Sequence, residues 1–185
     1  MRKLVAYLFY SVDGVTEAPD QWVQTFDEDM GEEISAVIAE QDDVLLGRVT
    51  YQEWAVYWPT ATDEPFGSFI NNVRKHVVST SLSQVDWRNA TLLKGDLREA
   101  VAKLKAAPGK TIGVHGSIQL VRSLVRERLL DELTLVMVPV IAGSGRHLFE
   151  PGDRLESLIL ARSRATRTGT VILTYQLASA AAREV

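Results

Sequence analysis

The sequence predicts a single α/β domain built on a mainly parallel central sheet of about eight strands that ends in an antiparallel hairpin. Strand-like apolar segments alternate with amphipathic helical segments through most of the chain, an order that favours parallel strands joined by crossover helices. Two strand-like segments at 158–166 and 170–177 are separated only by a turn ending in Gly169. No repeat, low-complexity tract or linker divides the chain, so we expect one domain over 1–178 and a frayed tail over 179–185.

The composition indicates an ordinary globular protein. The chain has 185 residues, 46% of them apolar and 24% charged. A net charge of -4 argues against general binding of nucleic acid. No apolar run approaches the roughly 20 residues that span a bilayer, and no signal core follows the N-terminus. We therefore expect a cytoplasmic protein without a membrane or nucleic-acid partner.

The residues best suited to metal or thiol chemistry are scarce. The chain has no cysteine, which excludes disulfides, thiolate metal sites and thiol nucleophiles. The three histidines, His76, His115 and His147, are far apart in sequence and none belongs to an H-x-x-x-H pair. We expect no metal site.

The first half of the chain is expected to contain a central strand followed by strand-helix units. Residues 4–9 are apolar on both faces, which is typical of a central strand. A loop at 15–28 carries Trp22, and both a functional loop and a hydrophobic plug over the core explain it. The further predicted elements are a helix at 29–41 ended by Asp42 and Asp43, a strand at 44–48, a helix opened by a Thr50–Glu53 capping box and stopped by Pro59, and a strand at 76–80.

The second half continues the alternation. Asp96 with Glu99 three residues later predicts a helix start, and Pro108-Gly109 closes that unit. The remaining predicted elements are a short strand at 91–93, a strand, turn and helix over 111–131, a long strand at 133–141 and the terminal hairpin.

Small and hydroxyl residues follow the carboxyl ends of three predicted strands, at 47–50, 79–81 and 116–117. Ligands of open α/β sheets lie outside those strand ends, so the three turns are expected to converge on one elongated anionic ligand. Arg48 can pair bidentately with a phosphate, although a solvated arginine and a simple helix cap at Thr50 explain the same residues singly. The spacing fits neither the G-x-G-x-x-G fingerprint nor the P-loop.

Five segments, in the same order and over nearly the full length, resemble the dihydrofolate reductase-like superfamily, and more closely its branch containing the reductase domain of bacterial riboflavin biosynthesis proteins. The segments are SVDG, LLGRVTYQEW, KHVVSTSL, GVHGSIQLVRSLVRERLLDEL and PVIAGSGRHLF. The resemblance implies a three-layer fold with an eight-stranded sheet, and NADPH as the cofactor.

The resemblance also assigns cofactor-binding residues. Those matching the adenosine phosphate and pyrophosphate segment are Gly47, Arg48, Val49 and Thr50; those matching the adenosine side are Ser79, Thr80 and Ser81; those matching the pyrophosphate turn are Gly116, Ser117, Ile118, Gln119 and Leu120.

The sequence departs from the dihydrofolate reductases at two places. They usually have Gly-Gly where this chain has His115-Gly116, and the first glycine there helps to form a cis peptide. They also carry a carboxylate on the first helix, within a tryptophan and proline motif. Acids occur near that place at 27–29, but the motif around them does not match. Folate specificity is therefore not implied.

The leading hypothesis is an NADPH-dependent reductase that passes hydride to a small heterocyclic (pterin- or pyrimidine-like) or carbonyl substrate. Asp13, after the first strand, is the candidate for polarising or protonating the substrate, with a turn-forming Asp-Gly as the alternative. Trp22, Trp54 and Trp58 are the candidates for the pocket wall, with core or interface roles as the alternative.

Two questions stay open from the sequence. The fold can persist as a non-catalytic nucleotide-binding or homo-oligomeric module, and the cofactor can be NADH if Arg48 does not hold a 2′-phosphate. A homodimer is a further expectation, with the 133–141 strand and the terminal hairpin as the segments that could extend across subunits.

Overall fold

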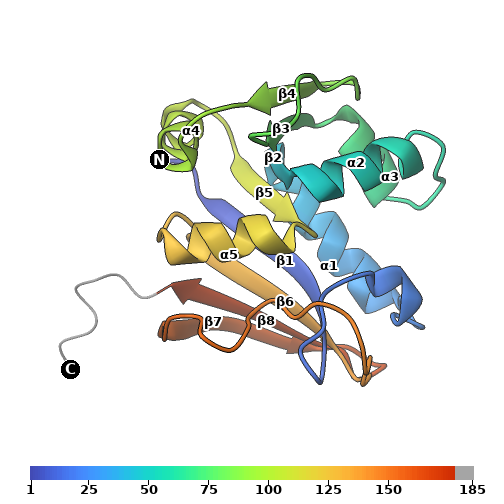
Figure 1. Ribbon diagram of the computed structural model, residues 1–185. Coiled ribbons are helices and arrows are strands. Elements are labelled where there is room, and N and C mark those ends of the chain that lie inside the picture. The colour runs from blue at the N-terminus through green and yellow to red at the C-terminus, as the bar shows by residue number, and fades with distance from the viewer. Residues whose placement is uncertain (178–185) are drawn as a thin grey trace.

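The computed structural model describes residues 1–177, so the predicted domain end at 178 and the predicted tail at 179–185 lie outside the described residues. The elements run along the chain as shown in Figure 1. They are β1 (Leu4–Ser11), the 3-10 helix η1 (Pro19–Gln21), α1 (Glu28–Ala39), β2 (Gln41–Gly47), α2 (Arg48–Tyr57), α3 (Phe66–Asn72), β3 (Arg74–Val78), β4 (Ala90–Leu93), α4 (Leu97–Ala106), β5 (Thr111–His115), α5 (Ile118–Arg126), β6 (Glu132–Val138), β7 (Leu158–Ala165) and β8 (Val171–Leu177).

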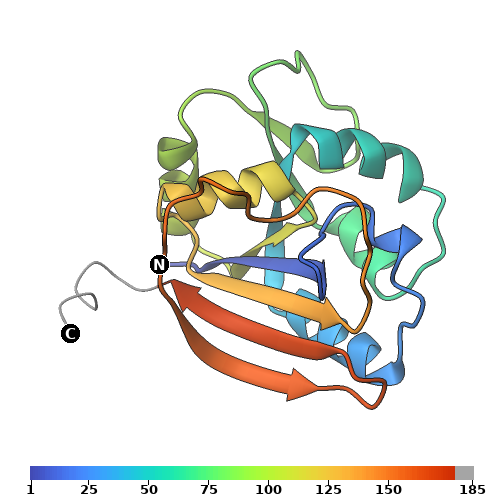
Figure 2. The ribbon, with the colours of Figure 1, turned by 60° about the horizontal axis from the view of Figure 1, so that its bottom comes forward.

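The strands form one eight-stranded sheet in the order β4-β3-β2-β5-β1-β6-β8-β7. The six strands from β4 to β6 are parallel, whereas β8 runs antiparallel to both β6 and β7. Figure 2 shows the β7–β8 hairpin at one edge of the sheet. The predicted mainly parallel sheet and its antiparallel edge hairpin are confirmed, and β1 is central between β5 and β6, as predicted.

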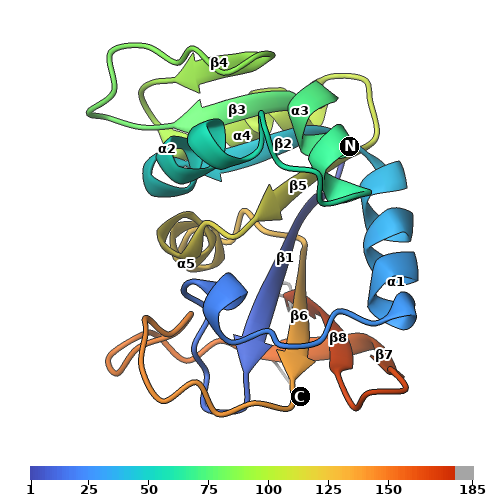
Figure 3. The ribbon, with the colours of Figure 1, turned by 90° about the vertical axis from the view of Figure 1, so that its right-hand side faces the viewer.

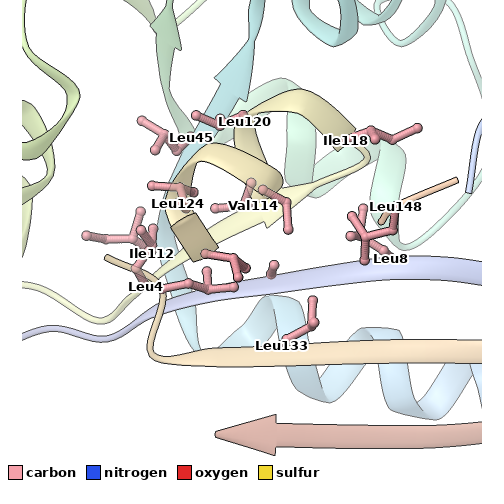
Figure 4. Packing of buried hydrophobic residues seen from close by; sticks show 14 of the residues in the cluster. Leu4, Leu8, Leu45, Ile112, Val114, Ile118, Leu120, Leu124, Leu133 and Leu148 are labelled. Atoms are coloured by element: carbon pink, nitrogen blue, oxygen red, sulfur yellow. The ribbon is translucent and has the colours of Figure 1, made fainter. Parts of the chain in front are cut away.

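The two faces of the sheet hold separate apolar clusters. On β1, Leu4, Ala6 and Leu8 face the cluster that contains α5, and Tyr7 faces the opposite cluster with α1. This alternation follows from the two-residue period of a strand. Figure 3 shows α5 and α1 on opposite sides of β1 and β6, and Figure 4 shows the leucine-rich packing beneath α5.

Asp42 and Asp43 do not end a helix, contrary to the prediction, but lie inside β2. Asp43 is 2% exposed and accepts from Arg74 at 2.8 Å and His76 at 2.8 Å, with Arg2 at 2.6 Å. Desolvation raises the pKa of Asp43, but the bonds from His76, Arg2 and Arg74 outweigh it and lower the pKa overall. A strand can bury such a carboxylate only because partners distant in sequence surround it.

The predicted Thr50–Glu53 capping box is wrong, because the N-cap of α2 is three residues earlier, at Gly47, and the helix begins at Arg48. Gly47 is its N-cap and supplies no side-chain hydrogen bond, and Thr50 is buried within the first turn. The predicted cap of α4 is confirmed, because Asp96 Oδ1 accepts from the backbone N–H of Glu99 at 3.0 Å.

Helix α3 was not predicted, and a buried lysine explains part of its stability. Lys75 is fully buried, and its Nζ donates to the carbonyls of Ile70 at 2.8 Å and Val73 at 2.9 Å near the end of α3. The same ammonium lies 4.5 Å from the ring centroid of Trp87. Desolvation lowers the pKa of Lys75 to about 8. The ammonium therefore occupies the negative end of the helix dipole.

Ion pairs join α1 to the terminal hairpin. Glu33 is 3% exposed and accepts two bonds from Arg162 of β7, at 2.6 and 2.7 Å. Asp29 accepts from the backbone N–H of Arg167 at 2.9 Å, and Asp27 accepts from Thr168 at 2.6 Å. These three carboxylates, at the start of α1 and within it, therefore bind the β7–β8 hairpin at the edge of the sheet.

Candidate functional site

The three predicted turns follow adjacent strands. Gly47 at the end of β2 pairs with Val78 at the end of β3, and Val44 of β2 pairs with Gly113 of β5. The turns after β3, β2 and β5 therefore lie next to one another at the carboxyl edge of the sheet, where ligands of open α/β sheets bind.

The turns after β2 and β5 are in direct contact. Gly47 donates its backbone N–H to Ser117 Oγ at 3.0 Å. A Cβ at Gly47 would lie 3.5 Å from Ser117 Cβ and 3.6 Å from Leu120 Cβ. A methyl group at Gly47 would therefore be in ordinary van der Waals contact with α5, so the first turns of α2 and α5 lie against each other here. We call residues 47–50 and 116–118 the turn cradle.

The helix termini of the turn cradle carry no side-chain caps. Asp27 and Asp96 cap α1 and α4, whereas the N-cap residues of α2 and α5, Gly47 and Ser117, make no capping bond. Neither α2 nor α5 has an acidic residue in its first turn. In α5 the N–H of Ile118 donates to the carbonyl of Gly116 at 3.1 Å, and the next N–H groups of α5 and the first ones of α2 are left as donors beside the positive ends of two helix dipoles. An anionic group fits this arrangement.

Gly116 has a backbone conformation that favours glycine, with φ of 67°. A Cβ there would lie 3.2 Å from Trp54 Cζ2 and 3.7 Å from Thr50 Cγ2, both on α2. Among residues 1–177 the only cis peptide joins Glu64 to Pro65, so the His115–Gly116 peptide is trans. The chain forms this turn without the cis bond of the dihydrofolate reductases.

The other residues predicted to bind the cofactor differ in how far their side chains are exposed. Arg48 and Val49 are exposed, and Arg48 Nη1 donates to Gln52 Oε1 at 2.8 Å. No carboxylate of residues 1–177 forms an ion pair with Arg48. Ile118 and Leu120 are buried in the α5 cluster, whereas Gln119 is exposed. The two buried residues can therefore contribute only backbone groups to a ligand.

In the turn after β3, one of the three hydroxyl side chains is bound by backbone groups of the same turn. Ser79 is buried, and its Oγ accepts from the N–H groups of Ser81 at 3.2 Å and Leu82 at 3.0 Å. Thr80 and Ser81 are exposed beside it. Ser79 shapes the turn, and its two neighbours present the available hydroxyls.

Asp13 binds the loop after β6. Its carboxylate accepts from Ser11 Oγ at 2.7 Å and from the N–H groups of Ala142 at 2.9 Å and Gly143 at 2.8 Å. The Ser11 bond, followed by the two backbone bonds, lowers the pKa of Asp13 to about 2. A carboxyl group this acidic does not donate a proton at neutral pH, so only the electrostatic role of Asp13 stays a prediction.

Trp22 lies apart from the other two predicted tryptophans. It is 7% exposed, and its Nε1 donates to the carbonyl of Glu17 at 2.8 Å within the same loop. These contacts favour the hydrophobic plug over the pocket wall for Trp22.

Trp54 and Trp58 belong to a group of rings packed edge to face or tilted, which we call the ring cluster: Tyr7, Trp54, Trp58, Phe66, Phe69 and His115. Phe66 is its centre, with ring centroids 5.6 Å from Trp54, 5.1 Å from Trp58 and 5.2 Å from His115. Because Trp54 also contacts Gly116, the ring cluster borders the turn cradle.

Sequence reasoning missed Gln41, Phe66, Phe69 and Gly113 of this region, and treated His115 only as a departure in the turn. Phe66 and Phe69 are three residues apart, a spacing that would have predicted one helix face. No local signal links Gln41 to His115, since they meet only through the β2–β5 pairing.

Residues 1–177 contain neither a metal-binding cluster nor a membrane-spanning helix. No group of three or more His, Asp or Glu side chains could hold a metal ion there, and no helix of that range is long and apolar enough to cross a membrane. A shallow depression of about 430 Å³ lies near the amino ends of β2 and β3. Its lining residues are Gln41, Asp42, Phe69, Asn72, Val73 and Arg74, none of which was a predicted site residue.

Known proteins are similar to this one along nearly the whole chain, in sequence or in structure. The uncharacterized protein YyaP of Bacillus subtilis is 27% identical over 180 residues, which cover 94% of each chain. A putative riboflavin biosynthesis protein from Shewanella sp. PV-4 superposes with a TM-score of 0.78 at 18% identity, over 96% of this chain and 99% of that one. Dihydrofolate reductase from Enterococcus faecalis, solved in complex with NADP(H), superposes with a TM-score of 0.63 at 14% identity, over 96% of this chain and 97% of that one.

The structural likenesses agree with a family model, the RibD C-terminal domain, that matches residues 2–172. The resemblance to the dihydrofolate reductase-like superfamily and to its riboflavin branch is thereby confirmed. The fold is of the reductase type, and the chain belongs to the RibD C-terminal domain family.

Proposed function

We propose that this protein is an NADPH-dependent reductase that transfers hydride to a small heterocyclic or carbonyl substrate. The observation that carries the proposal is the meeting of two uncapped helix termini, those of α2 and α5, at the Gly47–Ser117 contact. Free N–H donors and helix dipoles suit a pyrophosphate, and the structure of the Enterococcus faecalis reductase contains NADP(H) on the same kind of fold.

The chain's own residues fit such a cofactor. Gly47 and Gly116 lack side chains where helices α2 and α5 approach, so the backbone can come close to a phosphate. Arg48 has no acidic partner among the described residues and is available to a 2′-phosphate. NADPH would supply the hydride when bound, while the protein binds it and orients the substrate.

The carboxylates of α1 do not support folate as the substrate. Asp27 and Asp29 bond to Thr168 and Arg167, and the buried Glu33 is held by Arg162. None of these acids is free to bind a heterocycle. A ring substrate without a requirement for a carboxylate partner fits the ring cluster better.

Titration of the purified protein with NADPH, followed by nucleotide fluorescence or calorimetry, tests the first step. Binding with micromolar affinity is expected, and its absence would remove the proposal. Oxidation of NADPH in the presence of pterins, flavin precursors and simple carbonyls then identifies the substrate class.

Arg48→Ala tests the choice between NADPH and NADH. If Arg48 pairs with the 2′-phosphate, the variant should weaken NADPH about tenfold and leave NADH nearly unchanged, since a charge-assisted bond contributes roughly 1.5–3 kcal/mol. Arg126→Ala, which removes an equal charge from the far end of α5, is the matched control. Equal losses for both nucleotides would contradict the role of Arg48.

A non-catalytic nucleotide-binding or homo-oligomeric module is the second candidate. The observations that favour it are the mutual packing of the ring cluster and the low pKa of Asp13, which leaves no predicted proton donor. Tight NADPH binding without oxidation by any compound of the screen would favour this candidate over the enzyme.

We also propose a homodimer through β7. The predicted segment 133–141 cannot extend across subunits, because β6 is paired on both sides by β1 and β8. Within residues 1–177 strand β7 pairs with β8 alone, and its residues Ile159 and Leu160 are about half exposed. Exposed apolar edges are pairing surfaces. Light scattering should give the mass of a dimer, and Ile159→Lys should give that of a monomer.

A further inference from the structure

The two residues on either side of Gly116 are both held by strand β2. His115, before Gly116, lies with its Nε2 2.8 Å from Oε1 of Gln41, the first residue of β2. Ser117, after Gly116, accepts at its Oγ from the backbone N–H of Gly47, the last residue of β2, at 3.0 Å. The two ends of one strand therefore hold the two flanks of the glycine turn that is predicted to bind the pyrophosphate.

The contact between Gln41 and His115 extends along the whole of β5. Gln41 pairs with Thr111, the first residue of β5, and His115 is the last, a separation of roughly 13 Å at the rise of a parallel strand. The two side chains meet in between, over Gly113. A Cβ at Gly113 would overlap Gln41 Oε1 and lie 2.8 Å from His115 Nε2, so the contact requires a residue without a side chain there.

This hydrogen bond is buried and selects one orientation of the imidazole. Gln41 is 7% exposed and His115 is 3% exposed. An amide oxygen only accepts, so His115 Nε2 carries the proton and donates it. Tyr7, Phe66 and Phe69 lie with ring centroids 6.1, 5.2 and 6.3 Å from the imidazole. These rings restrict where the imidazole lies, and the amide of Gln41 determines which way its Nε2 points.

The turn at Gly116 needs such support. Its φ of 67° is open to glycine, the residue that loses most conformational freedom when it is fixed. The carbonyl of Gly116 accepts from the N–H of Ile118 at 3.1 Å, and Trp54 of α2 lies beside its Cα. A shift of either flank would therefore move the free N–H groups of α5 relative to those of α2.

We propose that Gln41 is a positioning residue for the cofactor, which through His115 holds the Gly116 turn in the conformation that presents the N–H groups of α5 to a pyrophosphate. This inference rests on the proposed function. A ligand that binds a loose turn must order it, whereas a turn held on both flanks is ordered before the ligand arrives. Gln41 acts without touching the cofactor, from the amino end of β2.

Gln41→Met tests the proposal, because methionine keeps much of the volume of glutamine but has no amide oxygen. Calorimetry should show that this variant binds NADPH about fivefold more weakly than the wild type, the scale of ordering one or two side chains on binding. Gln41→Glu, which keeps an acceptor oxygen for His115 Nε2, should bind NADPH within about twofold of the wild type. A loss in Gln41→Glu as large as that in Gln41→Met would contradict the role of the hydrogen bond.

His115→Phe breaks the same bond from its other side and keeps a ring among the aromatic neighbours. It should also weaken NADPH about fivefold, and the double variant should lose no more than either single variant, because each removes one shared bond. Losses that multiply in the double variant would show that Gln41 does not act through His115. All three variants should bind 2′-AMP, which has no pyrophosphate, as the wild type does, whereas equal losses for both ligands would contradict an effect on the turn.

Thr134→Val is the matched control. It also removes a buried side-chain hydrogen bond, the one between the hydroxyls of Thr134 on β6 and Thr174 on β8 at 3.0 Å, at a place away from the turn. Urea denaturation should show that both Thr134→Val and Gln41→Met lower stability, whereas only Gln41→Met loses affinity for NADPH. Unchanged affinity in Gln41→Met and His115→Phe, or an equal loss in Thr134→Val, would overturn the proposal. Absence of NADPH binding by the wild type would instead remove the proposed function itself.

Discussion

The turn cradle and the ring cluster meet where Trp54 lies beside Gly116, and they are built in opposite ways. In the turn cradle the contacts come from backbone N–H groups, glycines and a serine hydroxyl, at residues that are partly exposed. In the ring cluster they come from large side chains of β1, α2, α3 and β5 that pack against one another. The first region is formed by chain conformation and the second by side-chain packing.

This difference separates two kinds of specificity. Backbone donors at helix termini recognise an anion whatever side chains surround them, so the turn cradle suits a cofactor that many proteins share. A cluster of packed side chains that contains the unpaired Nε1–H of Trp58 recognises shape and hydrogen-bonding pattern, so it suits a particular substrate. Substitutions away from the Gln41–His115 bond should therefore act on cofactor binding and on substrate choice separately.

The largest expected effect is on the ring cluster. Gly113→Ala should lower the free energy of unfolding by about 3 kcal/mol, because the added methyl group displaces Gln41 and leaves two buried polar groups unpaired. Urea denaturation measures the change.

A second substitution sharpens this prediction. In Gly113→Ala combined with Gln41→Ala, the methyl group occupies the space that the amide left, and about half of the lost stability should return. A simple sum of the two single losses would show that Gln41 and Gly113 are independent.

The next effect is a dependence of stability on pH. The pKa of His115 is near 6.5 in the unfolded chain and about 4 in the folded protein, so the unfolded state binds more protons between these values. Stability should fall as the pH is lowered from 6.5 to about 4, by about 2 kcal/mol at pH 5 relative to pH 7, and this contribution should be constant below pH 4. Denaturation of the wild type and of His115→Asn at both pH values isolates it. Equal pH dependence in the two proteins would contradict the buried neutral histidine.

The smallest effect concerns the turn cradle. Gly116→Ala and Gly152→Ala both place a side chain at positive φ, of 67° and 95°, and each should lose about 1 kcal/mol of stability. Only at Gly116 does the added Cβ meet Trp54, at 3.2 Å, since nothing lies within 4 Å of Gly152. Gly116→Ala alone should therefore weaken NADPH, by about tenfold. Calorimetry measures the affinity of both variants for NADPH. Equal affinities of Gly116→Ala and Gly152→Ala would show that the turn at Gly116 tolerates the side chain.

The sequence predicted what depends on local pattern. The central position of β1 followed from apolar residues on both of its faces, and the hairpin followed from two alternating segments around Gly169. The neighbouring turns at Gly47 and Gly116 followed from the rule that parallel strands end at one edge.

What the sequence could not give depends on partners that are distant along the chain. In the sequence Asp43 resembles a helix breaker, but in the structure Arg2 and His76 pair with it inside a strand. Gln41 has no role that the sequence indicates, because its bond to His115 forms only when β2 lies beside β5. In both cases a tertiary contact outweighs a local preference. Helix α3 was missed for another reason, because it has only seven residues and its last turn is closed by the side chain of Lys75, which follows it in the sequence.

The burial of Lys75 also allows local opening of the protein to be measured by chemical labelling of its amine. Its amine, whose pKa burial lowers to about 8, is fully buried against Trp87 and cannot be reached by a reagent in the closed structure. Acylating reagents should therefore modify the exposed lysines first and reach Lys75 only when α3 and β3 separate. The rate at which this one amine is labelled would measure how often α3 and β3 separate by local unfolding.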